Sequence, residues 1–282
     1  MRPPRPRNSG RPDGKRPSAE ASKGQPKFQR PHGRNRERAR SSLPEGVFVV
    51  EGVAAIREYL RHKPASIQKI FAKERGFNAV REELSEFKVD LISVPDSDDD
   101  SLPPTPAWAR VQHEITDWNT FLSRAEKADS TANRLVLILD HISDPRNLGA
   151  IVRSAAFFGV RHVIVPEKRQ VLLTQAGVNT AQGGFALTDL VVVVNVSRAV
   201  EELKQKEYWI LGAAMGGEPI SAVRGRFERQ VLVLGSEDKG ISQNVLGHCD
   251  VVVAIPGAPK SLDSLNVSVA AGILIHELAG LR

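Results

Sequence analysis

The sequence has almost no cysteine and no long apolar run, and each absence excludes a class of protein. Cys249 is the only cysteine in 282 residues, which excludes an internal disulfide framework and a metal site built on a cysteine cluster. No apolar run approaches the ~18–20 residues that a membrane-spanning helix requires. The amino terminus lacks the apolar segment of a secretory signal, so we expect no signal peptide. We therefore expect a protein of a reducing compartment: the bacterial cytoplasm or, in a eukaryote, an organelle.

The positive charge of the chain is concentrated at its start. Residues 1–45 hold 13 basic against 4 acidic side chains, whereas the rest holds 26 against 29. The same segment contains eight of the 18 prolines and, after the first Met, only Phe28 and Leu43 as large apolar residues. It cannot bury enough apolar surface to offset the entropy of ordering, so we predict a disordered tail. The tail is either a solubilising segment or, as we favour, an arm that attracts nucleic-acid phosphates.

Residues 46–112 are predicted to form a small α/β domain, followed by a linker at 113–133. The apolar patterns of this region indicate strands at Val47–Val50, Ile67–Ala72 and Val89–Val94, and helices at Gly52–Leu60 and 77–86. The acidic, proline-rich stretch Pro95–Pro106 is predicted to be a loop. Residues 107–133 are interpreted as a polar connection with a helix near Trp118–Lys127.

Residues 134–282 show the pattern of a parallel β-sheet. Apolar, β-branched runs indicate strands at Leu135–Leu139, Val163–Val165, Val191–Val194, Trp209–Leu211, Val231–Leu234 and Val251–Ile255. Helical patterns lie at 149–158, 198–206 and about 267–281. Continuous apolar strands separated by helices are typical of a parallel sheet with helices on both faces. Ligands of such sheets bind at the carboxyl ends of the strands, so we expect the functional site in the loops there.

The loop after the first strand of this sheet contains Asn147 and Gly149 and leads into a helix that carries Arg153. Arg153 lies off the apolar stripe of this helix, and we expect it close to the first turn and the strand ends. Taken alone, this loop favours an ordinary structural interpretation. In that interpretation Asn147 caps the helix and Arg153 is a solvated surface residue.

The loop after Val231–Leu234 has Gly235 and Gly240 at the spacing of a phosphate-binding P-loop. A P-loop needs lysine directly after the second glycine, where this chain has Ile241, and Glu237 would repel phosphates, so we exclude an NTPase. Glu237 is then either a solvated carboxylate or the partner of a ligand with hydrogen-donating or positive groups.

The loop after Val251–Ile255 leads into the last helix. Either Ser264 or Asn266 could cap that helix, but capping would use only one of them.

Together, in this order and spacing, the three loops resemble the motifs of the SpoU (TrmH-like) branch of the SPOUT methyltransferases. The first motif, Asn-x-Gly-(x)3-Arg, corresponds to Asn147, Gly149 and Arg153. The second and third motifs correspond to Gly235, Glu237 and Gly240 and to Ile255, Pro256, Ser264, Leu265, Asn266 and Ser268. The resemblance covers about residues 135–282, and the unit before it resembles the substrate-binding domain of rRNA-modifying members. The chain has no Gly-x-Gly-x-x-Gly motif after a strand, which agrees with a cofactor site unlike that of Rossmann methyltransferases.

The resemblance implies an enzyme that transfers a methyl group from S-adenosylmethionine to a ribose 2′-hydroxyl of RNA, in rRNA or in tRNA. It also implies a carboxy-terminal trefoil knot and a homodimer. Neither metal nor membrane is expected to take part, because the leaving group is a neutral thioether and no spanning segment is present.

The resemblance also assigns roles to residues. Arg153 is placed at the 2′-hydroxyl. Because a guanidinium pKa above ~12 makes a neutral arginine costly, we expect Arg153 to hold the adjacent phosphate while the proton leaves through it. The residues implied to orient Arg153, the ribose and the cofactor are Asn147, Glu237, Ser264 and Asn266. The residues implied to hold the adenosine are Gly235, Ile255 and Leu265.

Two other functions stay open at this point. The link between Pro256 and Ser264 is about one residue longer than is usual in the family and holds a second proline. This difference leaves the alternative of an RNA-binding protein of ribosome assembly with little or no catalysis. A small-molecule methyltransferase is a third alternative, but it would leave the basic tail without a role.

Overall fold

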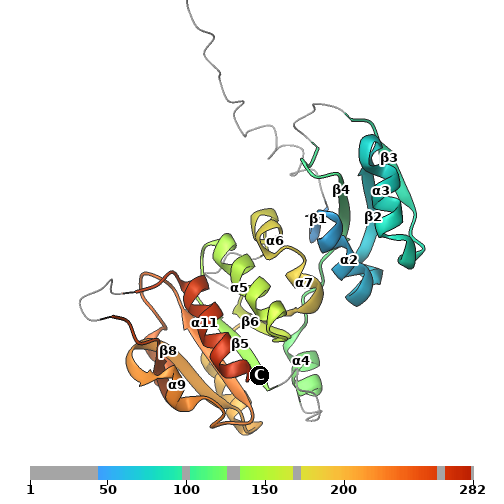
Figure 1. Cartoon of the computed structure of the whole chain (residues 1–282). Coiled ribbons are helices and arrows are strands. Elements are labelled where there is room, and N and C mark those ends of the chain that lie inside the picture. The colour runs from blue at the N-terminus through green and yellow to red at the C-terminus, as the bar shows by residue number, and fades with distance from the viewer. Residues whose placement is uncertain (1–43, 97–101, 126–133, 168–172, 259–263, 281–282) are drawn as a thin grey trace, which may run out of the picture.

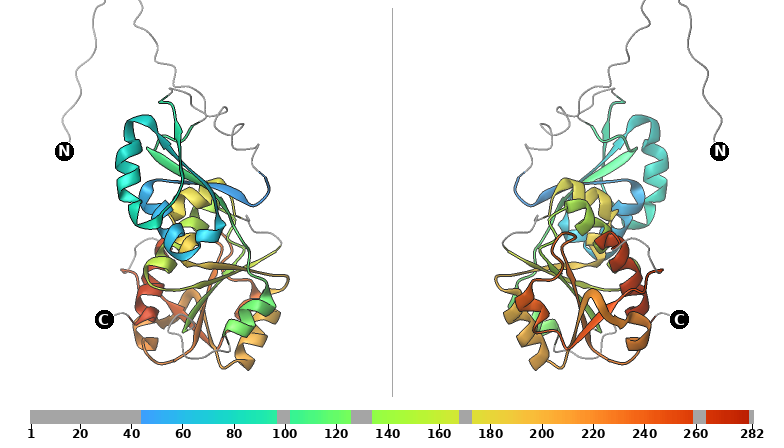
Figure 2. Two further views of the ribbon diagram at one scale, coloured as in Figure 1. Left: turned by 90° about the vertical axis from the view of Figure 1, so that its right-hand side faces the viewer. Right: turned by 90° about the vertical axis from the view of Figure 1, so that its left-hand side faces the viewer.

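The computed structural model describes residues 44–96, 102–125, 134–167, 173–258 and 264–280. Two β-sheets organise this part of the chain, and Figures 1 and 2 show the smaller one stacked above the larger one. We call the parts built on them the first and the second domain. Several sequence predictions fall outside the described residues: almost all of the tail, the acidic centre of the proline-rich loop, the last turn expected near Lys127 and residues 259–263.

The first domain is a four-stranded sheet in the order β1-β4-β2-β3. Its strands are β1 (Val47–Glu51), β2 (Ile67–Lys73), β3 (Leu91–Val94) and β4 (Ala107–Gln112), with helices α2 (Val53–His62) and α3 (Phe77–Glu83). β4 runs antiparallel to both β1 and β2, whereas β2 and β3 are parallel. The strands and helices predicted before Pro95 are therefore confirmed, with shifts of a few residues at their ends.

The prediction of a polar connection over 107–133 is wrong for its first six residues, which form β4 in the middle of the first sheet. The inward positions of β4 include Ala107 and Ala109, which are fully buried but give only a weak hydrophobic signal. On the other face Trp108 stacks on Phe71 with ring centroids 5.5 Å apart. Neighbouring strands, rather than the local sequence, supply the burial that makes this segment a strand.

The second domain is a six-stranded parallel sheet, as the sequence predicts, and the structure gives the strand order β10-β8-β9-β5-β6-β7. Its strands are β5 (Leu135–Asp140), β6 (His162–Pro166), β7 (Asp189–Val193), β8 (Trp209–Pro219), β9 (Gln230–Gly235) and β10 (Val251–Ala254). Every residue of the central strands β5 and β9 is buried. Burial on both faces is the physical reason that these strands are continuously apolar.

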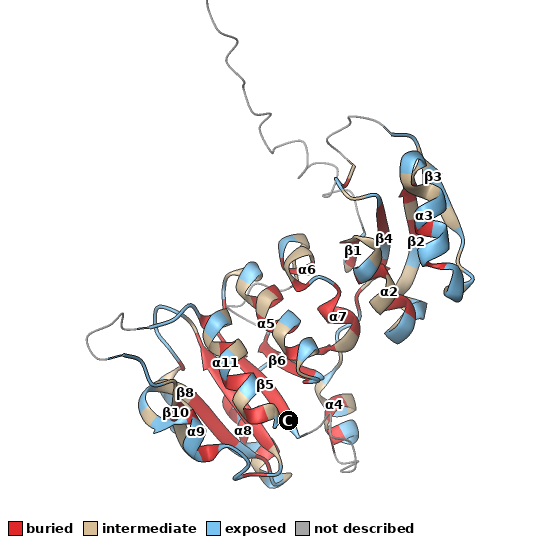
Figure 3. Cartoon of the chain, in the orientation of Figure 1, coloured by how far each residue is buried: buried red, intermediate tan, exposed pale blue. Residues whose placement is uncertain are grey.

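Helices cover both faces of this sheet. Its helices are α4 (Trp118–Ala125), α5 (Pro145–Phe157), α6 (Gln175–Ala181), α7 (Gly184–Leu187), α8 (Val196–Gln205), α9 (Ile220–Val223), α10 (Gln243–Leu246) and α11 (Val267–Ala279). Alternate residues of β5 face opposite layers: Leu137 packs in the cluster of α5 and α11, and Ile138 in that of α4 and α8. Figure 3 shows the buried strands between the two layers. No described helix is long and apolar enough to cross a membrane.

The two domains share a continuous interface. Buried apolar residues of the first domain and of one face of the second form a single cluster. The side chain of Gln175 bonds both backbone groups of Val49, accepting from its N–H at 2.9 Å and donating to its C=O at 2.6 Å. Gly183 has φ +89°, and an added Cβ there would lie 3.1 Å from Cα of Ala55. These contacts join β1 and α2 to α6 and α7 at close range.

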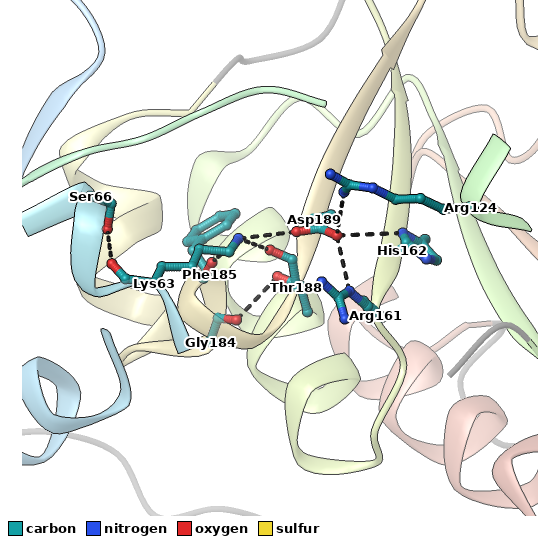
Figure 4. Close-up of polar contacts among 9 residues, drawn as sticks. All are labelled: Lys63, Ser66, Arg124, Arg161, His162, Gly184, Phe185, Thr188 and Asp189. Carbon is teal, nitrogen blue, oxygen red and sulfur yellow. Dashed lines mark hydrogen bonds and ion pairs between the residues drawn. The ribbon is translucent and has the colours of Figure 1, made fainter. Parts of the chain in front are cut away.

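A charged cluster at the edge of this interface is centred on Asp189, the first residue of β7 (Figure 4). Lys63, from the end of α2, donates to the carbonyls of Phe185 at 2.9 Å and Thr188 at 2.8 Å. Its Nζ also lies 3.2 Å from Oδ1 of Asp189, whose Oδ2 accepts from Arg161 Nε at 3.0 Å. Burial alone would raise the pKa of Asp189, but Lys63 and Arg161 outweigh it and lower this pKa.

Two histidines are buried near this cluster. His162 packs edge-on against Phe121, and His113 against Phe185, with ring centroids 5.0 and 5.1 Å apart. Burial lowers the pKa of each histidine to about 4. Both side chains are therefore neutral in the folded protein at pH 7.

The buried histidines predict acid sensitivity in a defined window. An unfolded histidine has a pKa of about 6.5, so between about pH 6.5 and 4 the unfolded chain binds more protons than the folded one. The free energy of unfolding then falls as the pH falls through this window, by up to about 3 kcal/mol for each histidine. We expect His162→Gln to reduce the slope of the free energy of unfolding against pH, by the equivalent of up to one bound proton. Urea titrations at several pH values between about 7 and 4.5 measure this slope. The exposed His62→Gln is the matched control, and equal slopes in all three proteins would contradict the prediction.

Candidate functional site

Three loops that the sequence singles out meet at the carboxyl edge of the second sheet. The loop after β5 leads into α5, and that after β9 spans Gly235–Gly240. The segment after β10 leads to α11. Asp140 and Gly235, the last residues of β5 and β9, are direct register partners, so these two loops start side by side.

Glu237 joins the three loops through one carboxylate oxygen. Its Oε1 accepts hydrogen bonds from Asn147 Nδ2 at 3.0 Å and from Asn266 Nδ2 at 2.5 Å. The backbone N–H of Val267 lies within hydrogen-bond distance of the same oxygen, at 3.4 Å. Asn266 Nδ2 donates in addition to Asn147 Oδ1 at 3.2 Å. We call this set the Asn147–Glu237–Asn266 triangle; the structure brings together three of the five predicted catalytic residues.

The orientation of the Asn266 amide follows from its place at the start of α11. Its Oδ1 caps the helix, accepting from Ser268 N–H at 2.9 Å and from Ser268 Oγ–H at 2.6 Å. With the oxygen held there, the NH2 group must point to Glu237 and Asn147. Asn266 therefore is the helix cap and a site residue at once. Ser268 holds the Asn266 side chain in this orientation. The sequence contained a signal for this role, because Ser268 is the second helical residue after the cap and its N–H is a usual partner of a capping side chain.

Asn147 does not cap α5, so that interpretation is wrong. Asp144 is the N-cap, and its carboxylate accepts from the backbone N–H of Arg146 at 2.8 Å, with Pro145 as the first helical residue. Hydrogen bonds from the Arg146 side chain and backbone lower the pKa of Asp144. The Asp-Pro pair is the stronger sequence signal for a helix start. Asn147 lies in the first turn, where its side chain is free to reach Glu237.

Gly149 and Arg153, the other two residues of the first motif, lie further along α5 and do not reach Glu237. An added Cβ at Gly149 would lie 2.3 Å from the carbonyl oxygen of Gly177, so this glycine lets α5 and α6 approach each other. Arg153 is exposed, and it is the ninth residue of α5 rather than part of its first turn as expected. It comes six positions after Asn147 in the helix, about 9 Å along the axis and about 120° around it. Arg153 therefore lies apart from the triangle within one chain.

The loop Gly235–Gly240 is a tight turn that folds back on its own start. Ser236 and Gly240 exchange backbone hydrogen bonds of 3.2 and 2.8 Å, and Gly240 has φ +65°. An added Cβ at Gly235 would lie 2.0 Å from the carbonyl carbon of Gly240. The glycine at position 235 is thus required for the turn that presents Glu237.

Asp140 is a buried carboxylate that sequence reasoning did not single out. Its Oδ2 accepts from the backbone N–H of Ser242 at 2.8 Å, which ties the end of β5 to the segment after the Gly235–Gly240 turn. Its Oδ1 lies 2.7 Å from Nδ1 of His141. The sequence contained one signal for Asp140: it is a charged residue at the end of a strand that is otherwise apolar.

The remaining predicted residues border the same edge. Ile255 is half-buried and packs against the core cluster just after β10. Ser264 and Leu265 lie exposed before α11, and Leu265 retains 49% of its surface. Within the described part of the chain, no three His, Cys, Asp or Glu side chains are grouped so that they could hold a metal ion.

Comparison with known families and proteins gives consistent matches. The family model for the SpoU rRNA Methylase family matches residues 134–276. A Staphylococcus haemolyticus protein assigned to the TrmH family of tRNA/rRNA methyltransferases is 31% identical over 239 residues, covering 82% of this chain and 94% of that protein. The Coxiella burnetii 23S rRNA (guanosine-2'-O-)-methyltransferase RlmB is 38% identical over 169 residues, covering 60% of this chain and 66% of RlmB.

Other relatives are longer than the matched region. An uncharacterized tRNA/rRNA methyltransferase of Synechocystis is 40% identical over 152 residues, which cover 54% of this chain and 39% of the relative. The chain thus spans about half or less of the length of several of the relatives it matches.

Solved structures share the fold. The SpoU methyltransferase AviRb from Streptomyces viridochromogenes superposes with a TM-score of 0.70 at 21% identity, over 87% of this chain and 95% of AviRb. An AdoMet-bound rRNA methyltransferase from Sinorhizobium meliloti gives a TM-score of 0.65 at 16% identity, over 87% of this chain and 90% of that one. Both likenesses confirm the α/β fold with a parallel sheet.

The Gly235–Gly240 turn gives a prediction about stability. Gly235→Ala forces a methyl group into the backbone of Gly240, so we expect a loss of about 3 kcal/mol or more in the free energy of unfolding. Gly247→Ala is the matched control, because its Cβ would meet only ordinary contacts of 3.5 Å and beyond. Urea unfolding measures both variants, and a Gly235→Ala protein as stable as Gly247→Ala would show that the turn does not need glycine.

Proposed function

The chain belongs to the SpoU rRNA methylase family, and we propose that it transfers the methyl group of S-adenosylmethionine to a ribose 2′-hydroxyl of RNA. The observation that carries the proposal is the Asn147–Glu237–Asn266 triangle, because it joins all three family motifs at one edge of the sheet. We propose rRNA as the substrate, with tRNA as the alternative, in line with the name of the Coxiella relative.

The residues around the triangle fit the proposed cofactor. Exposed Leu265 and half-buried Ile255 offer apolar surface for an adenine ring, and no side chain at Gly235 covers the backbone of its turn. When bound, S-adenosylmethionine supplies an electrophilic methyl group. Asn147, Glu237 and Asn266 would then orient the ribose and the cofactor, with Ser264 beside them, so that the hydroxyl faces that methyl group.

Arg153 is proposed to hold the phosphate next to the reacting ribose. A guanidinium binds phosphate with two parallel hydrogen bonds and stays charged, so it positions the RNA and stabilises the developing alkoxide. Because Arg153 lies about a third of a turn away from Asn147 around α5, a single chain does not place it at the triangle. We infer that the complete site forms when a second copy covers this face of α5.

A homodimer is supported by an exposed apolar stripe. Leu265, Val269 and Ile273 are spaced four residues apart at the start and along one side of α11, and they retain 49%, 51% and 38% of their surface. α5 lies alongside, since an added Cβ at Gly272 would be 3.6 Å from Ser154 Oγ. Phe157 of α5, four residues after Arg153, is 81% exposed. Exposed apolar side chains on two adjacent helices are typical of a protein–protein interface.

A trefoil knot is part of the proposal. β10 is an edge strand, yet α11, which follows it, packs on α5 and bonds Glu237 in the loop after β9. The chain therefore returns from the edge across the Gly235–Gly240 turn. This path supports the knot that the family resemblance implies.

The proposal assigns a role to each part of the chain. We propose that the first domain within residues 46–112 binds the RNA substrate, that residues 134–282 carry out methyl transfer, and that the segment 1–45 attracts phosphates. The linker 113–133 is less separate than expected, because Thr116 bonds the carbonyl of Leu190 at 2.9 Å. We propose a cytoplasmic location, since the relatives named above are bacterial.

Substitution of Arg153 tests the proposed function. We expect Arg153→Ala to lower methyl transfer to ribosomal RNA by about 10²-fold or more, because the phosphate contact and the stabilised alkoxide are lost. Arg153→Lys is expected to recover only part, since lysine cannot bind bidentately. Exposed Arg198→Ala on α8 is the control. Tritiated methyl incorporation is the measurement, and full activity of Arg153→Ala would refute the role of this residue.

The same preparation separates catalysis from the assembly alternative. Calorimetry with S-adenosylmethionine should give binding in both the wild type and Arg153→Ala, because Arg153 contacts RNA rather than cofactor. No heat of binding at millimolar cofactor, together with intact RNA binding, would favour a ribosome-assembly protein instead.

The exposed stripe predicts the oligomeric state. The double variant Val269→Glu, Ile273→Glu places two carboxylates in the proposed interface, where their burial costs several kcal/mol. We expect sedimentation velocity to show a dimer for the wild type and a monomer for this variant. Val194→Glu is the control, as it changes a valine that is 79% exposed away from the stripe. A wild type that sediments as a monomer would rule out the dimer.

A further inference from the structure

The opposite, amino-terminal edge of the second sheet carries a regular row of arginines. Arg229, Arg134 and Arg161 each stand directly before a strand, and these strands, β9, β5 and β6, are neighbours in the sheet. Neighbouring strands are about 4.8 Å apart, so the three residues are evenly placed. Their carbonyls accept backbone hydrogen bonds from Trp209, Gln230 and Asp189 respectively, at 2.7–2.9 Å. The row is thus built into the sheet and is not a chance cluster of surface side chains.

Helix α4 extends this row at the lower end of the sheet in Figure 1. Arg229 Nη2 donates to the carbonyl of Ala125 at 2.7 Å, which holds the end of α4 against β9. The adjacent Arg124 lies 3.4 Å from Asp189 Oδ2, on the oxygen that also binds Arg161 (Figure 4). Half of the Arg124 and Arg161 side-chain surface stays exposed. One buried carboxylate thus orients both guanidinium groups, while their outer faces are accessible.

An exposed aromatic residue stands at the other end of the row. Trp209, the first residue of β8, stacks on Phe227 with ring centroids 4.4 Å apart and is still 46% exposed. Arg226 lies over the Phe227 ring at 5.1 Å and pairs with Glu218 at 3.5 Å. An indole supported on one face by another ring can take a nucleobase on its free surface. Base stacking of this kind contributes about 1–3 kcal/mol.

We propose that this surface, the arginine edge (Arg124, Arg134, Arg161, Arg226, Arg229 and Trp209), binds a single-stranded segment of the RNA substrate. Guanidinium groups contact the phosphates, and one base stacks on Trp209. Exposed Glu228 and Glu207 lower the net positive charge of this surface. Phosphate contacts alone therefore bind weakly, and a strand that also stacks a base on Trp209 binds better. The inference rests on the proposed RNA substrate and adds a second contact, on the edge of the sheet opposite the methyl-transfer site.

The test uses the full chain and a fluorescein-labelled 12-nucleotide single-stranded RNA of mixed sequence. Fluorescence anisotropy gives Kd as a function of KCl concentration. The variant Arg134→Gln, Arg226→Gln is expected to weaken binding about tenfold at 100 mM salt and to lower the salt slope by about 1.4, since a single-strand phosphate contact contributes about 0.7. Trp209→Ala is expected to weaken binding by 5-fold or more, and Trp209→Phe to restore part of it. Arg198→Gln, whose side chain is 79% exposed on α8, should behave as the wild type.

A second measurement reports on Trp209 directly. Trp108 is only 5% exposed and Trp118 is half-buried with its Nε1 bonded to Glu202 at 2.6 Å, so RNA should quench mainly Trp209. The quench should vanish in Trp209→Phe. Kd, salt slope and quench unchanged in the arginine-edge variants, while wild-type binding is normal, would overturn the arginine edge and leave methyl transfer untouched. Failure of the wild type to bind or methylate any RNA would instead overturn the proposed function.

Discussion

One carboxylate oxygen, Oε1 of Glu237, is the contact on which the site depends. It bonds Asn147, which is 90 residues away in the sequence, and Asn266, which is 29 residues away. An ionised carboxylate accepts hydrogen bonds and donates none, and it has several lone pairs. It can therefore bind N–H groups from separate loops at the same time. The parallel sheet makes this possible because the ends of β5 and β9 are register partners. Gly235 then turns the chain so that Glu237 faces the other two loops.

A second polar contact decides how the two domains are placed. Lys63 leaves the first domain and binds two carbonyls and the Asp189 carboxylate of the second. Removing such charges from water is costly, and a buried ion pair adds stability only when its remaining hydrogen bonds are satisfied. Here the carbonyls of Phe185 and Thr188 satisfy the lysine, and Arg161 shares the carboxylate. The first domain is held in a defined position relative to the second, which agrees with the proposal that it binds the RNA substrate.

The second sheet uses its two edges differently. At the carboxyl edge, amides and one carboxylate form a compact network that orients neutral groups. At the amino edge, Arg124 and Arg161 bond Asp189 and keep half of their side-chain surface in solvent. A long side chain with a planar, permanently charged end can fill both roles, because its inner N–H groups bond the protein while its outer ones face water. The structural contacts of these arginines are therefore compatible with the proposed binding of RNA.

The sequence by itself determined the parallel sheet, four of the eight described helices around it (α4, α5, α8 and α11), the three loops of the site and the family. Continuous β-branched runs report burial on both faces directly, and motif residues keep their spacing whatever the tertiary structure. Only the tertiary structure decided that 107–112 is a strand, since the burial of Ala107 and Ala109 comes from β1 and β2. It also decided that Asn147 joins Glu237 while Arg153 faces away, and that Lys63 reaches Asp189. Those contacts depend on the order of strands and the packing of helices, and a local pattern carries no information on partners a hundred residues away.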